Sequence, residues 1–185
     1  MSPSNIKRII AMSTQPKHCY TLEEYLELER NSETRYEYWN GEVYVMSGGT
    51  QAHELITTNI HDLLAAQLAG KGCRAYPSGM QIKVPAAPPY HYADGSVVCG
   101  KAEIEEFNNN HLLLNPVLIY EVLSPSTEAF DRGDKFTYYK SIPSLREYLL
   151  AAQHRPHITQ YFKKTTDDWD YKEINGLDAR IHCQA

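Results

Sequence analysis

The sequence lacks any apolar run that approaches the ~20 residues needed for a membrane-spanning helix. It has only four cysteines, and no two of them form a Cys-x-x-Cys pair. This argues against a zinc site or a disulfide framework, so we expect the cysteines to be small buried or surface residues. Residues 1–17 have no long apolar centre of the kind found in signal peptides. We therefore expect a flexible tail over 1–19 and a cytoplasmic protein without membrane contacts.

Basic residues are scarce for a protein that binds nucleic acid. Lysine and arginine number 18 against 23 acidic residues, which gives a net charge of −5. This balance argues against a large basic surface but allows a local groove. The chain also lacks a Gly-rich phosphate loop and a Ser-His-Asp order, so nothing supports a nucleotide kinase or a serine hydrolase. Its 185 residues, 42% of them hydrophobic, are typical of one soluble domain, here 20–185.

The most informative stretch is a buried strand expected over 117–123. All seven residues are apolar or aromatic except Glu121, with Pro116 before them and Ser-Pro-Ser-Thr after the strand. A continuous apolar run of this kind is typical of a strand covered on both faces. An ionised carboxylate buried there is costly unless a cation or hydrogen-bond donors meet it. Glu121 therefore needs a partner, and its position is compatible with a structural ion pair as well as with a functional site.

A second strand-like run, 92–99, also carries a single acid, Asp94. Two lone carboxylates on neighbouring buried strands repel each other unless a positive charge lies between them. A divalent cation with oxygen ligands is the simplest candidate for that charge.

Asn40-Gly41 predicts a β-hairpin with a type I′ turn. In that register Glu37 lies opposite Tyr44 and Trp39 lies opposite Glu42, so both acids fall on one face. Glu37 then points either to solvent, the commoner arrangement for a carboxylate, or toward the acidic site.

Hydrophobic periodicity and turn residues predict the remaining elements. His53 falls in the first turn of a helix and lies eight residues before His61, which is too far along a helix for a shared metal site. We expect it to be a hydrogen-bonded histidine, compatible with a phosphate bound nearby. The expected elements are a capped helix from residue 21 to about 30, a helix over 51–69, a core strand over 74–84 interrupted at Pro77, a stiff link over 86–89, a surface turn or short helix over 101–114, a helix over 131–141, a strand over 145–152, and a hairpin of 157–162 with 169–174.

Three of these segments resemble a known family. They are Asp94, the segment 121–127 (Glu-Val-Leu-Ser-Pro-Ser-Thr) and the segment 131–139, which begins Asp-Arg-Gly-Asp-Lys. Together they resemble the Uma-two family of restriction endonucleases in the PD-(D/E)xK nuclease superfamily, from about residue 20 to 148. The segment 121–127 is the specific part. The resemblance implies an α/β fold with a restriction-endonuclease-like core: a mixed central β-sheet flanked by helices, with the N-terminal helix and β-hairpin added to it.

The resemblance also implies a metal site. In the superfamily two acids and a backbone carbonyl hold Mg²⁺, which polarises the phosphoryl oxygen and lowers the pKa of bound water. Asp94, Glu121 and the carbonyl of Val122 match these ligands, for Mg²⁺ or Mn²⁺. Glu37, His53 and Asp131 are candidate accessory residues.

The superfamily's lysine, which positions or activates water, is missing from its usual place. It lies two residues after the second acid, and position 123 here is leucine. Lys135 on the following helix is the expected catalytic replacement, and we expect its ammonium within about 6 Å of Glu121, a reach that its long side chain allows. Lys83 is the competitor. A surface Lys135 paired with Asp131 four residues earlier is the non-catalytic alternative.

Three functions of different classes follow. The first is a Mg²⁺-dependent endonuclease that hydrolyses phosphodiester bonds of DNA, expected as a homodimer. The second is a catalytically degenerate nucleic-acid-binding or regulatory domain, favoured by the net charge and the missing strand lysine. The third is an interaction protein whose 14 tyrosines contribute to an oligomer interface. Metal affinity separates the first function from the other two, and DNA affinity without metal separates the second from the third.

Overall fold

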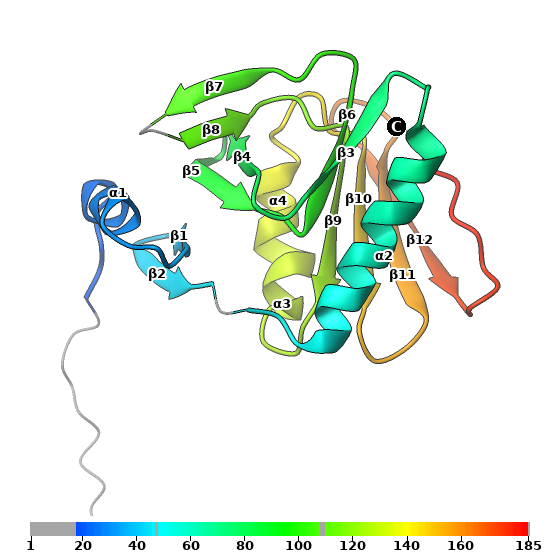
Figure 1. Ribbon diagram of the computed structural model, residues 1–185, viewed down its shortest axis with the longest axis horizontal. Helices are drawn as coiled ribbons and strands as arrows, with labels where there is room; N and C mark the ends of the chain where they lie inside the picture. Colours follow the sequence, from blue (N-terminus) through cyan, green and yellow to red (C-terminus); the bar gives the residue numbers. More distant parts are fainter. Residues whose placement is uncertain (1–17, 47, 108–109, 185) are drawn as a thin grey trace, which may run out of the picture.

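Strand β9 (Leu118–Leu123) is the centre of the fold, and all six of its residues are buried. The computed structural model describes residues 18–46, 48–107 and 110–184. In it β9 belongs to a six-stranded sheet in the order β12-β11-β10-β9-β6-β3 (Figure 1). Only β9 and β10 run parallel, so the sheet is mixed, as predicted. The other strands of this sheet are β3 (Cys73–Pro77), β6 (Gly95–Cys99), β10 (Glu147–Ala152), β11 (His157–Lys163) and β12 (Trp169–Asn175).

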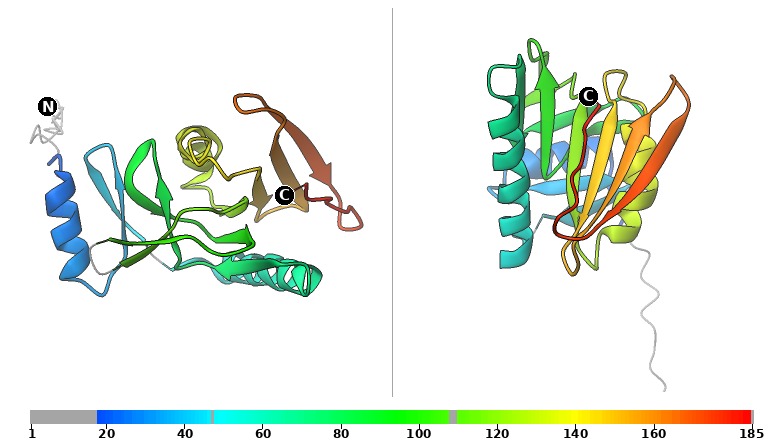
Figure 2. Two further views of the ribbon diagram at one scale, coloured as in Figure 1. Left: turned by 90° about the horizontal axis from the view of Figure 1, so that it is seen from above. Right: turned by 90° about the vertical axis from the view of Figure 1, so that its right-hand side faces the viewer.

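Helices cover both faces of this sheet (Figure 2). On one face lies α2 (Gln51–Leu68), which packs on Leu118 and Tyr120. On the other lies a continuous helical segment made of α3 (Glu128–Phe130), a π-helical turn η1 (Asp131–Lys135) and α4 (Phe136–Tyr139). It packs on Ile119 and Leu123. Side chains alternate between the faces of a strand, so Glu121 lies on the face covered by this second helix.

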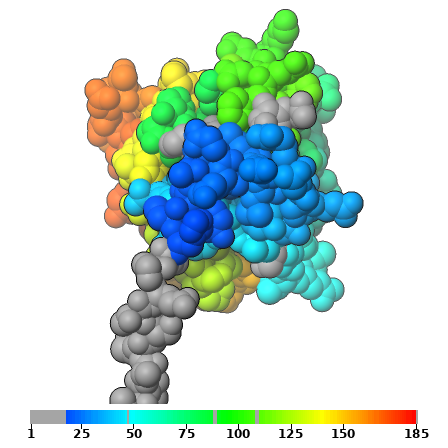
Figure 3. All heavy atoms as spheres, turned by 90° about the vertical axis from the view of Figure 1, so that its left-hand side faces the viewer, coloured from blue at the N-terminus to red at the C-terminus, as the bar shows by residue number. Residues whose placement is uncertain are grey.

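The N-terminal elements form a unit at one end of the sheet, where α1 and the hairpin cover the surface (Figure 3). Tyr25 of α1 packs with Tyr90 and Leu112, which belong to a second, four-stranded sheet in the order β5-β4-β8-β7. The elements of this unit are α1 (Leu22–Arg30), β1 (Tyr36–Trp39), β2 (Glu42–Val45), β4 (Gln81–Val84), β5 (Ala87–Tyr92), β7 (Ile104–Phe107) and β8 (Asn110–Leu113).

The predicted capping box and hairpin are confirmed. The hydroxyl of Thr21 accepts from the backbone N–H of Glu24, and the Glu24 carboxylate accepts from the N–H of Thr21. In the hairpin Glu37 pairs with Tyr44, and Asn40-Gly41 adopts the two positive φ angles, 46° and 86°, of a type I′ turn.

Four sequence-based element predictions differ from the structure, three of them because local patterns do not reveal which sheet a strand joins. The expected single strand over 74–84 is two strands, β3 and β4, and they belong to different sheets. The expected proline link over 86–89 lies largely inside β5, and the expected turn or helix over 101–114 is the β7–β8 hairpin. The helix expected over 131–141 begins earlier, at Glu128, and contains the π turn.

Asp94 and two cysteines also differ from expectation. Asp94 lies in the bend between β5 and β6 rather than within a strand. Cys73 and Cys99 form a disulfide, although a separation of 26 residues carries no pairing signal. The β3–β6 register places them directly opposite each other. Cys19 and Cys183 are free and exposed.

Most of the expected tail lies outside the described residues. Where the described chain begins, the backbone N–H of Tyr20 donates to the carbonyl of Gly41 at 2.8 Å, so residue 20 is tied to the hairpin. None of the helices in the described ranges combines the length and the apolar composition that a membrane crossing requires.

Gly95→Ala should destabilise the protein because a Cβ there would overlap the buried ring of Tyr120 on the paired strand. We expect a loss of about 1–3 kcal/mol in the free energy of unfolding, measured by urea denaturation. Gly133→Ala is the matched control, since Gly133 is exposed within the helical segment and a Cβ there meets nothing within 4 Å. It should gain about 0.5–1 kcal/mol. Equal effects of the two substitutions would show that the contact with Tyr120 does not constrain position 95.

Candidate functional site

The sheet opens between β6 and β9 at the point where the two predicted acids meet. The backbone ladder between these strands ends at the pair Gly95–Tyr120. Beyond it, the backbone N–H of Asp94 donates to Glu121 Oε2 at 3.2 Å, and the backbone N–H of Val122 donates to Asp94 Oδ2 at 2.7 Å. Side-chain oxygens thus replace the backbone acceptors of the ladder. This holds both carboxylates next to each other at the end of the sheet.

The ammonium of Lys135 lies among three carboxylates. Its Nζ is 2.9 Å from Glu121 Oε1, 3.6 Å from Asp131 Oδ1 and 3.7 Å from Glu37 Oε1. It also donates to the backbone carbonyl of Tyr92 at 3.2 Å. The Lys135 side chain is only 7% exposed. The predicted proximity of Lys135 to Glu121 is therefore confirmed, and the alternative of a surface lysine paired with Asp131 is wrong.

The charges of this cluster do not balance. Three carboxylates lie within 3.7 Å of the one ammonium, and Asp94, which pairs with His53, lies next to Glu121. Burial, with Asp94 and Asp131 nearby, raises the pKa of Glu121 well above its ordinary value, although Lys135 opposes this. Burial acts to lower the pKa of Lys135, but the surrounding carboxylates outweigh it and raise that pKa. Lys135 therefore remains an ammonium ion, and the cluster still has room for further positive charge.

Glu37 reaches this cluster from the hairpin rather than pointing to solvent. Its Oε1 lies 3.1 Å from Nδ1 of His91. Burial acts to raise the pKa of Glu37, but Lys135 and His91 hold it at about 2. Glu37 is therefore ionised at neutral pH.

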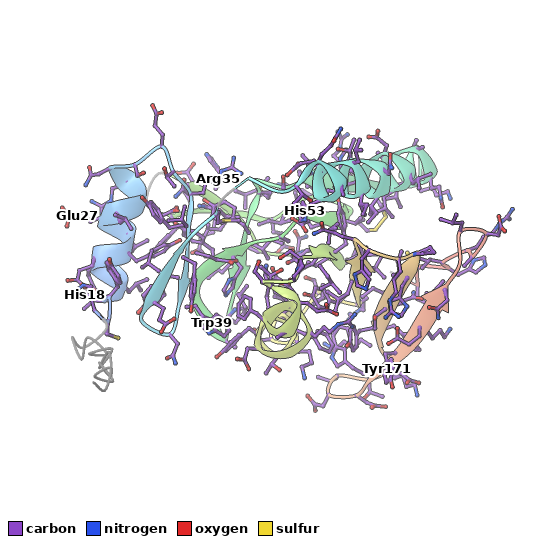
Figure 4. The ribbon with its side chains drawn as sticks, turned by 90° about the horizontal axis from the view of Figure 1, so that it is seen from below. His18, Glu27, Arg35, Trp39, His53 and Tyr171 are labelled. Carbon is purple, nitrogen blue, oxygen red and sulfur yellow. A yellow bond between two sulfur atoms is a disulfide. The ribbon has the colours of Figure 1, made fainter. Side chains whose placement is uncertain are left out.

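His53 contacts Asp94 from α2, on the other side of the sheet (Figure 4). Its Nε2 lies 3.1 Å from Asp94 Oδ1, and this hydrogen bond raises the pKa of His53. Its Nδ1 lies 3.4 Å from Nε2 of Gln153, whose Oε1 accepts from the Thr50 hydroxyl at 3.1 Å. Both oxygens of Asp94 are thus held, one by His53 and one by Val122. His53 is a hydrogen-bonded histidine, as expected.

The structure brings together all six predicted side chains: Asp94, Glu121, Lys135, Glu37, His53 and Asp131. The competitor Lys83 instead pairs with Glu105, and its side chain is 41% exposed. It has no place in this site.

Sequence reasoning missed Gln153, His91 and Tyr139. The Tyr139 hydroxyl donates to Glu121 Oε1 at 3.1 Å. A usable signal existed for Gln153, the first residue after β10, because ligand sites form at the carboxyl ends of parallel strands. Only the tertiary arrangement connects His91 and Tyr139 to the site.

The donor atoms fit a hard divalent cation. Each carboxylate oxygen has two lone pairs, so Glu121 Oε2 and both Asp94 oxygens keep one free beside their hydrogen bonds. Oxygen ligands of this kind suit Mg²⁺ and Mn²⁺. Among the described residues, no three His, Cys, Asp or Glu side chains are grouped to hold a metal. A cation here therefore needs backbone, water or substrate oxygens as well.

The six-stranded mixed sheet, its helices on both faces and the buried cluster of acids with one lysine define a restriction-endonuclease-like α/β protein. The sequence profile of the Uma2 family, described as "Putative restriction endonuclease", matches residues 22–185. The chain belongs to this family.

Three individual proteins are similar to this chain. The uncharacterized protein slr1290 of Synechocystis sp. is 35% identical over 161 residues, which cover 85% of this chain and 83% of that protein. A second uncharacterized Synechocystis protein, sll1609, is 31% identical, with 87% and 90% covered. The crystal structure of a "putative nuclease belonging to DUF820" from Anabaena variabilis has a TM-score of 0.67 at 14% identity, covering 86% of this chain and 88% of that one. At that identity the likeness concerns the fold.

Glu37→Gln should remove a pH-dependent part of the stability. Because the folded-state pKa of Glu37 lies below its ordinary value of 4.5, the ionised group stabilises the folded protein above about pH 4.5. That contribution is lost as the pH falls toward about 2. We expect Glu37→Gln to cost about 3 kcal/mol at pH 7 and much less at pH 3, measured by urea denaturation. Glu33→Gln, at an exposed residue nearby, is the control and should change little. A cost for Glu37→Gln that is equal at both pH values would contradict the ion pair.

Proposed function

We propose that the protein is a metal-dependent endonuclease that hydrolyses phosphodiester bonds of DNA, with Asp94 and Glu121 as metal ligands and Lys135 as the cation beside them. One observation carries the proposal: two adjacent carboxylates lie at the opening of the sheet, with a buried ammonium 2.9 Å from Glu121. The description of the Uma2 family as restriction endonucleases supports the reaction class and DNA as the substrate. We also propose that the protein forms a homodimer.

Asp94, Glu121 and the backbone carbonyl of Val122 would hold the cation. The N–H and C=O of one strand residue point to the same edge of the strand. Because the Val122 N–H donates to Asp94, its carbonyl faces the same opening. When bound, Mg²⁺ or Mn²⁺ would polarise the phosphoryl oxygen and lower the pKa of bound water.

The protein's own residues prepare this site. His53 and the Val122 N–H fix the two oxygens of Asp94, so its carboxylate is oriented before a substrate arrives. Lys135 stays an ammonium ion, so it donates hydrogen bonds and offsets negative charge but does not act as a general base. It stabilises the charge that develops on a phosphodiester under attack and holds Glu121 in place. Lys135 thereby provides the positive charge that the superfamily's lysine would provide at position 123, where this chain has leucine.

Asp94→Asn and Glu121→Gln should each weaken Mn²⁺ binding about tenfold or more, because each removes an anionic ligand. Isothermal titration calorimetry measures this effect. Asp62→Asn, at a side chain on α2 that is 73% exposed, is the control and should bind like the parent. Unchanged affinity in both site variants would place the metal elsewhere or show that there is no metal site.

Lys135→Met should abolish cleavage of single- and double-stranded DNA in Mg²⁺ or Mn²⁺. It should also lower the free energy of unfolding by about 3–5 kcal/mol, because it leaves buried carboxylates without their ammonium. Cleavage is therefore assayed at a temperature where circular dichroism shows the variant to be folded. Lys140→Met is the matched control from the end of the same helix, where the exposed ammonium lies over the Phe136 ring. Cleavage by folded Lys135→Met would exclude the proposed role. A parent that binds DNA but cuts it with neither metal would favour a degenerate nucleic-acid-binding domain.

A further inference from the structure

His91 is buried in a way that costs stability. Its side chain on β5 has no exposed surface. Nδ1 lies 3.1 Å from Glu37 Oε1, whereas Nε2 has no hydrogen-bond partner among the described residues. An unpaired buried polar group costs about 1–3 kcal/mol. An apolar ring in the same space, between Trp39 and Tyr139, would avoid this cost.

The one polar contact of His91 leads directly to the site. An ionised carboxylate only accepts hydrogen bonds, so Nδ1–H donates to Glu37. Glu37 Oε1, the same oxygen, lies 3.7 Å from Lys135 Nζ, which lies 2.9 Å from Glu121 Oε1. A buried chain of contacts therefore runs from β5 through the hairpin and the π turn to the proposed metal ligand.

Among the residues in this series of contacts, Glu37 depends most on its hydrogen bonds to keep its side chain in position. Glu121 and Asp131 lie on the sheet and on the helix that carries Lys135. Glu37 comes instead from a two-stranded hairpin at the side of the core. A two-stranded hairpin is marginally stable by itself, so its position depends on contacts such as the one with His91.

We propose that His91 is a positioning residue: its Nδ1–H holds Glu37 so that Glu37 keeps the Lys135 ammonium against Glu121. The inference rests on the proposed nuclease function for its catalytic consequence, but the positioning itself can be observed without any cleavage. It makes the added N-terminal hairpin a part of the active site.

Three substitutions at position 91 test this inference. His91→Phe keeps a ring of similar shape and removes both the donor and the unpaired nitrogen. His91→Asn places an amide N–H near the position of Nδ1, and His91→Gln places one near the position of Nε2. Only Asn can therefore restore the hydrogen bond to Glu37. His111→Asn, at an exposed histidine of β8, is the control.

Two readouts distinguish positioning from a structural role. The ¹⁵N NMR signal of the Lys135 ammonium, assigned by its loss in Lys135→Arg, reports on its surroundings, and steady-state kinetics separate kcat from KM. We expect His91→Phe to shift the Lys135 signal and to lower kcat about 10–100-fold with KM little changed. Its melting temperature should change little, because the lost hydrogen bond to Glu37 and the removal of the unpaired Nε2 act in opposite directions. His91→Asn should restore both readouts in part, and His91→Gln should not.

The inference is overturned if the Lys135 signal in His91→Phe matches that of the parent. It is also overturned if Asn and Gln restore the signal equally, or if folded His91→Phe cuts DNA as fast as the parent. If the parent cuts no DNA, the nuclease function fails, and the Lys135 signal alone still decides whether His91 positions the ammonium.

Discussion

The site depends on one buried ammonium. Without Lys135, Glu121 and Asp131 would be buried carboxylates with too few donors, and Glu37 would lose its nearest positive charge. The π turn brings Asp131 and Lys135 into the core together with the next residue, Phe136, and all three are buried. Such turns are frequent at functional sites. One irregular turn of helix thus places an ammonium beside Glu121, although position 123 is leucine.

The excess of carboxylates gives the cluster its chemical character. A simple ion pair matches one acid with one base, whereas three acids here lie within 3.7 Å of one lysine. The remaining negative charge lies where the sheet opens, next to Asp94 and the Val122 backbone. Carboxylate oxygens are the ligands that hard divalent cations prefer, and the proposed metal site depends on this excess of acids.

The hairpin belongs to this site as much as the core does. Its type I′ turn sets the register, and the register puts Glu37 on the face toward Lys135. On the other side, α2 brings His53 to Asp94, and Gln153 at the end of β10 supports His53. The hairpin, α2 and the end of β10 therefore converge on Glu121 of the central sheet and on Asp94 in the bend beside it.

Local signals in the sequence determined much of this protein. They predicted the capped first helix, the hairpin register and the buried strand with Glu121, because each depends on neighbours along the chain or on the cost of burying a charge. Lys135 was predicted as the partner of Glu121 from the family resemblance, because position 123 carries leucine in place of the superfamily's lysine. Sheet membership is different, since hydrogen bonds between distant strands decide it. For that reason local signals did not predict that β3 and β4 belong to different sheets, that Cys73 and Cys99 form a disulfide, or that His91 contacts Glu37. Those contacts join residues far apart in the chain, and only the tertiary structure brought them together.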